Sequence, residues 1–434
     1  MASQAYLTNE AEAVPNIKSI INKTLDLPPS SIEVFALNPH FFVIGTYLLE
    51  PETGKGPIGD SETAQTSTAE TIRNGSLILG LINERNTDVA SATQSPNRPT
   101  ANREIIQSRN STTDISITLL QTLPTPYAVL DLHFSPHDPS TCAVATSTGA
   151  VCLFTLSLIS GGHLTSIKSI QIADSSVLVL SLAWKPSSST PSMIAASLSS
   201  GQIAIFDHEF PDTTLRKVQA HSLEVWTLAW SMLPSTDGSV VLYSGGDDSA
   251  LCRHIECLQN QDVQIDEGAQ AEDVYEPLNR DVKTHSAGVT AILPVPMLSS
   301  NDQELLLTGS YDEYIRLLEP AVIGKRSKVL AEKRLGGGVW RLKLLRKVDC
   351  TPGQGTRMSV LASCMHAGAR VVEISRSIEG TWTIAVLAKF EEHESMNYAS
   401  GVCTQLDGNL GNLIFLSTSF YDRKLCIWNI TNDD

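Results

Sequence analysis

Three histidines in this chain stand at similar distances ahead of an aspartate. The pairs are His221 with Asp248, His285 with Asp312, and His393 with Asp422. A histidine held by a carboxylate can act as a general base, but a repeated pair is also what a repeated fold would use to tie a loop to a turn. We expect a structural role for the first two pairs and leave both roles open for the third.

One repeated region has a loop and a turn at the corresponding positions but carries no histidine–aspartate pair. Its turn reads Met365-His366-Ala367-Gly368, with alanine where the other turns carry aspartate, so His366 lacks the usual partner. The loop before it reads GGGVWR (336–341) and has no histidine. Backbone N–H groups of Gly337 and Gly338 could stabilise an oxyanion. The alternative is a tight turn required by close packing. Together these features make His366 or His393 the candidate base, with Asp422 orienting His393.

Aromatic residues stand beside the turn aspartates. Tyr311 and Tyr421 each directly precede one of them, and Trp340 is expected on the same side of the fold. Aromatic faces next to a carboxylate such as Asp312 can hold a quaternary ammonium group by cation–π attraction. Ordinary packing between repeated units is the competing interpretation. We predict substrate binding by Trp340, Tyr311, Asp312 and Tyr421.

Composition and missing motifs exclude several classes of function. The formal net charge of −16 disfavours direct binding of nucleic acid or anionic membranes. There is no GxSxG, HExxH or P-loop string, so Ser310 or Ser419 as a nucleophile has no supporting motif. The eight cysteines form no CxxC pair. We expect no metal, no organic cofactor and reduced thiols.

The N-terminus also lacks the features of a secretory signal. It has neither a basic start nor an apolar segment of signal-peptide length, and no run in the chain approaches eighteen apolar residues. These features predict a cytoplasmic protein.

The elements that position these residues are repeated hairpins. The last reads LIFLSTSFYDRKLCIWNI (413–430), two apolar runs joined by a short polar turn. Equivalent hairpins end at Phe154, Phe206, His254, Leu318 and Glu373. Each has an apolar strand before it and a more polar strand after it. This pattern predicts six four-stranded units from Tyr127 onward, with a seventh supplied by the N-terminal part.

The pattern predicts a single all-β domain over residues 1–434, a seven-bladed WD40-type β-propeller. Its last unit is one strand short, and residues 16–27 could supply that strand and close the ring. Three polar segments, 51–74, 84–113 and 259–281, are predicted to be disordered insertions. A closed ring has few free strand edges, so we expect a monomer.

Five segments together resemble one family. They are LTGSYDEYIRLLE (307–319), GGGVWRLK (336–343), LASCMHAG (361–368), HESMNYASG (393–401) and STSFYDRKLCIW (417–428). They are similar to the WD-repeat diphthine methylesterases of the diphthamide pathway, sometimes labelled diphthine methyltransferases. FVIGTYLLE (42–50) is similar to the first blade of that family.

This resemblance implies a reaction and a partner. The reaction is hydrolysis of a carboxyl methyl ester on the modified histidine of translation elongation factor 2, giving diphthine, without a cofactor. The substrate would carry a trimethylammonium group, which fits the aromatic and acidic residues named above. The competing hypothesis is a non-enzymatic WD40 scaffold that recruits pathway or trafficking partners.

Overall fold

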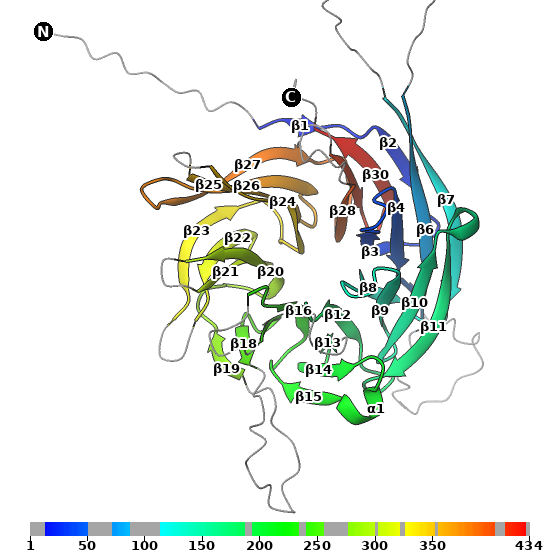
Figure 1. Ribbon diagram of the computed structural model, residues 1–434, viewed down its shortest axis with the longest axis horizontal. Helices are drawn as coiled ribbons and strands as arrows, with labels where there is room; N and C mark the ends of the chain where they lie inside the picture. Colours follow the sequence, from blue (N-terminus) through cyan, green and yellow to red (C-terminus); the bar gives the residue numbers. More distant parts are fainter. Residues whose placement is uncertain are drawn as a thin grey trace, which may run out of the picture.

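The computed structural model describes residues 14–50, 72–86, 113–186, 193–233, 240–255, 277–299, 303–321, 326–351, 355–403 and 413–430. Seven sheets stand side by side in a ring around a central channel (Figure 1). This confirms the predicted seven-bladed β-propeller.

Each blade is an antiparallel sheet that runs outward from the channel. The first holds β3 (Pro29–Val34), β4 (Phe41–Thr46), β6 (Ile72–Asn86) and β7 (Thr113–Thr125), with β5 (Leu48–Glu50) paired to the start of β6. The second holds β8 (Val129–Phe134), β9 (Thr141–Thr146), β10 (Ala150–Ser157) and β11 (His163–Gln171). The third holds β12 (Val179–Trp184), β13 (Met193–Leu198), β14 (Gln202–Asp207) and β15 (Arg216–Gln219).

The remaining blades follow the same plan. The fourth holds β16 (Val225–Trp230), β17 (Val241–Gly246), β18 (Leu251–Ile255) and β19 (Pro277–Asp281). The fifth holds β20 (Val289–Leu298), β21 (Glu304–Ser310), β22 (Tyr314–Glu319) and β23 (Lys328–Arg334). The sixth holds β24 (Arg341–Thr351), β25 (Gly355–Ser363), β26 (Ala369–Arg376) and β27 (Trp382–Phe390). The seventh holds β28 (Ala399–Cys403), β29 (Ile414–Thr418) and β30 (Lys424–Asn429).

The core lies between the blades. The second strands are mostly apolar or small, as in β4 and β29, and every residue of these two strands is buried. Both faces of such a strand pack against other sheets, so the alternation seen in half-exposed strands is lost. The fourth strands border solvent and do alternate, as the mostly exposed β11 shows.

The N-terminal segment closes the ring, as predicted. β2 (Ile21–Thr24) pairs antiparallel with β30 and completes the seventh blade. The preceding β1 (Asn16–Ile17) pairs in parallel with β27 and adds a fifth strand to the sixth blade, which the sequence did not predict. Figure 1 shows both strands outside β27 and β30. One segment therefore binds two adjacent blades together.

This closure gives a first testable expectation. The N–H of Ile20, a half-exposed residue, donates to Ile427 O at 2.7 Å. Ile20→Pro removes that donor and should lower the free energy of unfolding by about 1–3 kcal/mol, because the carbonyl loses its partner. Ile20→Ala keeps the N–H and is the matched control in urea denaturation. Equal stability of the two variants would show that this hydrogen bond does not contribute to closure.

Two kinds of loop meet on one face of the ring, as expected. We call it the upper face; it carries the loop before each innermost strand and the turn between the second and third strands. Backbone bonds join them, for example from Asp247 N to Glu224 O at 2.8 Å and from Tyr311 N to Gly288 O at 3.0 Å. The candidate site residues on such loops are thereby held on the upper face.

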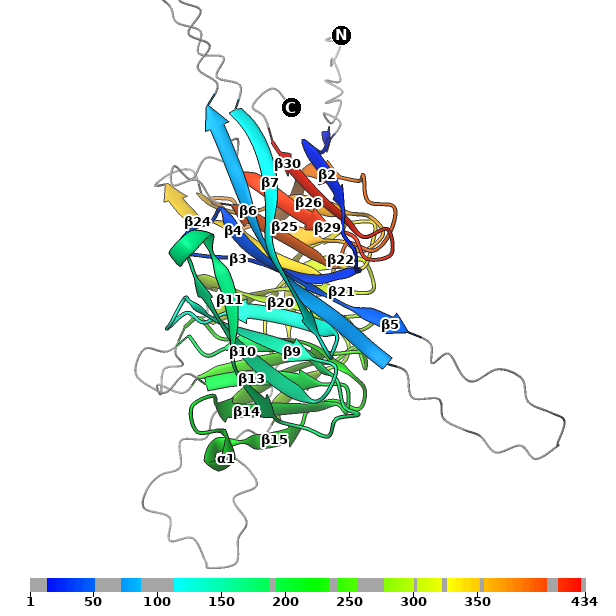
Figure 2. The ribbon, with the colours of Figure 1, turned by 90° about the vertical axis from the view of Figure 1, so that its right-hand side faces the viewer.

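The predicted insertions lie mainly outside the described residues. Where their ends are described, the strands run further than expected. Residues 72–74 and 84–86 belong to β6, residue 113 to β7, and residues 277–281 to β19. Figure 2 shows β6 and β7 continuing past the neighbouring blades at one end, with β5 beside β6 at the other.

Two sequence expectations about cysteines and membranes can be compared with the described residues. Six cysteines in this part of the chain are buried and free of disulfides: Cys142, Cys152, Cys252, Cys364, Cys403 and Cys426. None of its helices has the length and apolar character needed to cross a membrane.

Candidate active site on the upper face

Six aromatic side chains form a continuous chain of ring contacts on the upper face. They come from the fourth to seventh blades, and we call them the aromatic surface: Trp226, Tyr311, Trp340, Tyr398, Phe420 and Tyr421. All except the exposed Tyr421 are half-buried. Such a surface can take up a ligand that is both apolar and cationic.

Three of these rings stand at steep angles to one another. The centroid of Trp340 lies 5.5 Å from that of Trp226 and 6.0 Å from that of Tyr311, with interplanar angles of 57° and 46°. Trp226 and Tyr311 are 6.3 Å apart at 87°. We call these three residues the aromatic triad. The rings are tilted or edge-on rather than stacked, and all three residues are partly exposed, so a cation can approach the triad.

A carboxylate is fixed beside the aromatic triad. Trp226 Nε1 donates to Asp247 Oδ1 at 3.0 Å. A Cβ placed on Gly288 would lie 2.8 Å from that same oxygen and 3.0 Å from the Tyr311 ring, so the carboxylate and the ring both border this glycine. Burial first, and then the charges of Asp247, Tyr398 and Glu224, raise the pKa of Tyr311. The triad therefore combines aromatic faces with negative charge.

A strand irregularity places Trp226 on this surface. Val225 pairs with Gly246 and Thr227 with Gly245, so Trp226 is the extra residue of a β-bulge. A bulge adds one residue to a strand and so changes the direction in which a side chain points, out of the regular alternation between the two faces of the sheet. Bulges also interrupt the starts of β3, β8, β12 and β20.

The predicted oxyanion glycines are tightly packed. A Cβ on Gly337 would lie 2.2 Å from Cys364 O, and one on Gly338 would lie 2.7 Å from Met365 Sδ. Close packing of this loop against the turn of the sixth blade thus explains both glycines, which was the alternative interpretation. Their role as oxyanion donors stays a prediction.

The three predicted histidine–aspartate pairs differ in geometry. His221 Nδ1 lies 2.9 Å from Asp248 Oδ1, as predicted. The Nδ1 atoms of His285 and His393 have no hydrogen-bond partner among the described residues. The expected orienting bond from Asp422 to His393 is therefore missing; the Asp422 carboxylate only opposes the lowering of the His393 pKa by burial.

All three histidines share one further contact. The Nε2 atom lies 2.8 Å from a hydroxyl on the second strand of the same blade, in the pairs His221–Ser244, His285–Thr308 and His393–Ser417. Trp428 Nε1 donates to Ser417 Oγ at 3.1 Å and completes this network in the seventh blade. His393 thus occupies the same buried position as its two counterparts, which indicates a structural role.

The turn aspartates are bound by local groups. Asp312 lies 2.9 Å from the Arg316 guanidinium and accepts from Ser286 N at 3.0 Å. Asp422 accepts from Glu394 N and Ser395 Oγ, both at 3.0 Å, and from Ser419 Oγ. The Asp312 carboxylate is almost fully buried, so its predicted contact with substrate finds no geometric support.

His366 differs from these histidines because it is exposed. The residue before it, Met365, contacts the loops that carry Trp340 and Tyr398. Its sulfur packs on Gly338, and its carbonyl accepts from Asn397 N at 3.0 Å. The alternative nucleophiles are buried and bonded, Ser310 to Ala287 O at 3.0 Å and Ser419 to Asp422. Among the candidate bases and nucleophiles, His366 alone is exposed, and it directly follows Met365.

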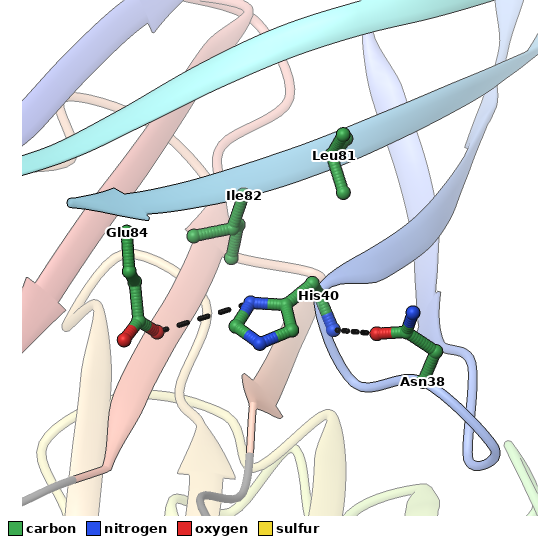
Figure 3. A pocket seen from close by; sticks show the side chains of 5 residues that line it. All are labelled: Asn38, His40, Leu81, Ile82 and Glu84. Carbon is green, nitrogen blue, oxygen red and sulfur yellow. Dashed lines mark hydrogen bonds and ion pairs between the residues drawn. The ribbon is translucent and has the colours of Figure 1, made fainter. Parts of the chain in front are cut away.

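Two cavities lie elsewhere. One of about 420 Å³ borders the turn between β3 and β4, on the face opposite the aromatic surface. Figure 3 shows His40 in it between Asn38 and Glu84, with its Nδ1 atom 3.9 Å from the Glu84 carboxylate. The second, of about 170 Å³, lies in the central channel. No group of three metal-binding side chains is found in the part of the chain that the structure describes.

Comparison with known proteins identifies the family. Diphthine methyltransferase of Schizosaccharomyces pombe is 33% identical over 304 residues, covering 69% of this chain and 78% of that protein. The chain belongs to the diphthine methyltransferase family of the diphthamide pathway. The Saccharomyces cerevisiae protein of that name is 25% identical over 351 residues, which cover 69% of this chain and 83% of the relative. The human protein is 25% identical over 284 residues, 63% of this chain and 55% of the relative.

The comparison with solved structures gives information about the fold alone. No family model matches the chain. A chain from a crystal structure of the mitotic checkpoint complex aligns over the whole of both chains with a TM-score of 0.54 and 17% identity. At this identity the likeness concerns the propeller alone.

Sequence reasoning missed Trp226 and Tyr398 of the aromatic surface, and Asp247 beside it. Asp247 directly precedes the turn aspartate Asp248, the position that Tyr311 and Tyr421 hold in their own blades. That alignment could have found Asp247. Trp226 depends on a bulge, which the alternation of apolar residues does not show.

The buried histidines predict acid sensitivity. Burial lowers the pKa of His393 to about 4 and keeps its imidazole neutral in the fold. In the unfolded chain this group takes up a proton near pH 6.5, so stability is lost as the pH falls from about 6.5 to about 4, by roughly 3 kcal/mol for this residue.

Urea denaturation from pH 4.5 to 7.5 measures this loss. In His393→Gln the slope of unfolding free energy against pH should be smaller by about one proton. An unchanged slope would contradict the lowered pKa of His393. A titration of kcat/KM near neutral pH that this variant abolishes would support His393 as a base.

Proposed function

We propose that the chain is an enzyme of diphthamide biosynthesis that hydrolyses the carboxyl methyl ester of methylated diphthine on translation elongation factor 2, releasing diphthine and methanol. The aromatic triad with its fixed Asp247 carboxylate carries this proposal. The substrate's trimethylammonium group matches this combination of aromatic faces and negative charge. Family membership supports the pathway.

The cation would seat against Trp340, Tyr311 and Trp226. Its charge would be balanced by Asp247 rather than by Asp312, since Asp312 is already paired with Arg316. Tyr421, exposed at the edge of the aromatic surface, would cover the bound group. This arrangement fixes the modified side chain and leaves its ester free to reach the turn of the sixth blade.

The chemistry at that turn would need only water and side chains. His366 would remove a proton from water as the water oxygen attacks the ester carbonyl. The N–H groups of Gly337 and Gly338 would stabilise the resulting oxyanion. Collapse of the tetrahedral intermediate would expel methoxide, which takes up the proton from His366 and leaves as methanol. The other product is the carboxylic acid, which releases its proton to solvent and becomes the carboxylate.

Trp340→Ala tests the cation site. A desolvated cation–π contact contributes about 2 kcal/mol, so kcat/KM for a methyl ester carrying a trimethylammonium group should fall about 30-fold. The matched substrate carries a neutral tert-butyl group of the same shape and should lose much less. Trp340→Phe retains an aromatic face and should recover part of the activity. Equal losses for both substrates would show that Trp340 contributes shape rather than cation binding.

The second candidate function is a WD40 scaffold without catalysis. The aromatic surface also suits a protein-binding site, because half-buried aromatic residues are typical of such sites. This alternative predicts capture of the elongation factor with no change in its methyl content.

A further inference from the structure

An ion cluster lines the cavity of about 170 Å³ in the central channel. We call it the axial cavity. Its walls are the innermost strands of the first, second, sixth and seventh blades. The charged side chains come from three of them: Glu33 on β3, Asp131 and His133 on β8, and Arg341 and Lys343 on β24. None of these residues has a part in the site already described.

These side chains form a connected network. Arg341 Nη2 lies 3.0 Å from Asp131 Oδ1, and Lys343 Nζ lies 3.5 Å from Glu33 Oε2. The His133 ring lies between the two carboxylates, with Nδ1 3.6 Å from Glu33 and Nε2 3.4 Å from Asp131. Five charged groups therefore share a narrow space between innermost strands.

The proximity of the two carboxylates keeps His133 charged. Burial alone would lower the pKa of His133, but Asp131 and Glu33 raise it to about 10. Burial likewise opposes ionisation of Glu33 and Asp131, yet Lys343, Arg341 and His133 lower the pKa of both carboxyls on balance. At neutral pH three cations thus face two anions, an excess of one positive charge.

A local excess of positive charge attracts a counter-ion, and one anion would remove the imbalance. Uncharged polar groups are also present. Ser31 lines the cavity, and its buried hydroxyl has no hydrogen-bond partner among the described residues. Ser400, on the innermost strand of the neighbouring seventh blade, lines it as well. The Ser31 hydroxyl and the Arg341 guanidinium can both donate hydrogen bonds to a carboxylate. A phosphate dianion would over-neutralise the cluster and repel Asp131 and Glu33.

We propose that the axial cavity binds a single carboxylate group. The cavity lies next to the aromatic surface along the chain, because Trp340 directly precedes Arg341 and Tyr398 stands two residues before Ser400. If the proposed function holds, the acid product is the source of this carboxylate, and only the source rests on that function. The carboxylate would sit between Arg341, Lys343 and His133.

The test uses acetate as the probe and the full-length protein. Saturation-transfer NMR at constant ionic strength should show transfer to the acetate methyl group in the wild type. Lys343→Gln should weaken acetate binding about tenfold, because it removes the excess charge. Glu33→Gln should strengthen it, because it adds net positive charge. Lys328→Gln, on the exposed strand β23, is the matched control and should change nothing.

The opposite effects of Lys343→Gln and Glu33→Gln on acetate binding distinguish a binding site from a purely structural ion cluster. Loss of a purely structural ion pair would destabilise the Lys343 and Glu33 variants alike and leave acetate unaffected. Absence of transfer in the wild type, equal binding in all variants, or equal competition by phosphate and acetate would overturn the proposal. Arg341 is left intact because its removal would leave Asp131 without its guanidinium partner. Since no hydrolysis is measured, failure here is distinct from failure of the proposed esterase function.

Discussion

Replacing His366 by alanine should lower kcat for ester hydrolysis by about 10²–10⁴-fold, the usual contribution of a general base. The imidazole is exposed, so the free energy of unfolding should stay within about 0.5 kcal/mol of the wild type. KM should change little, because the aromatic triad still holds the cation. Initial rates with the methylated elongation factor, together with urea denaturation, measure both quantities.

His393→Gln is the matched comparison. His393 is buried, with Nε2 bonded to Ser417 and a pKa lowered to about 4, so its loss should reduce stability more than kcat. The opposite pattern, with full turnover in His366→Ala and none in a folded His393→Gln, would transfer the role of base to His393. Full turnover in both variants would exclude the proposed mechanism while leaving the function itself open.

Trp428→Ala should cost about 3–5 kcal/mol of unfolding free energy. Trp428 is fully buried, with its ring stacked 4.2 Å from Phe415 and 5.1 Å from Phe390, and its Nε1 donates to Ser417. The change leaves a cavity between the sixth and seventh blades and removes a donor from the hydroxyl that holds His393.

Urea denaturation of Trp428→Phe separates the two contributions. Phenylalanine retains most of the stacking but lacks the N–H, so its loss should be about 1–2 kcal/mol, which reports the hydrogen bond and the smaller ring. If Trp428→Ala costs less than about 1 kcal/mol, the stacked rings do not anchor the last blade.

The fold could be predicted from the sequence because its signals are local and repeated. The hairpin at 413–430 has close counterparts upstream, and the missing last strand indicated the closing role of residues 16–27. The pairing of β1 with β27 could not be predicted in this way, since two residues in parallel register carry no pattern of their own.

The candidate site could be predicted only in part. Tyr311, Trp340 and Tyr421 were found because they stand at repeated positions near the turns. Trp226 and the five charged residues of the axial cavity were missed for a physical reason. Trp226 reaches the aromatic surface through a bulge, and the charged residues meet between innermost strands of different blades; no spacing within one blade encodes either arrangement. The orienting bond expected between Asp422 and His393 is absent because nearer donors occupy the carboxylate.

The most direct measurement of the central claim is the mass of the modified histidine peptide. Purified protein is incubated with elongation factor 2 carrying methylated diphthine, and the peptide mass is followed over time, with Trp340→Ala and His366→Ala as slow controls. The proposed function predicts replacement of the ester methyl by hydrogen and release of methanol, with the trimethylammonium group retained. Unchanged methyl content in the presence of folded protein that binds the elongation factor would contradict it and favour the scaffold.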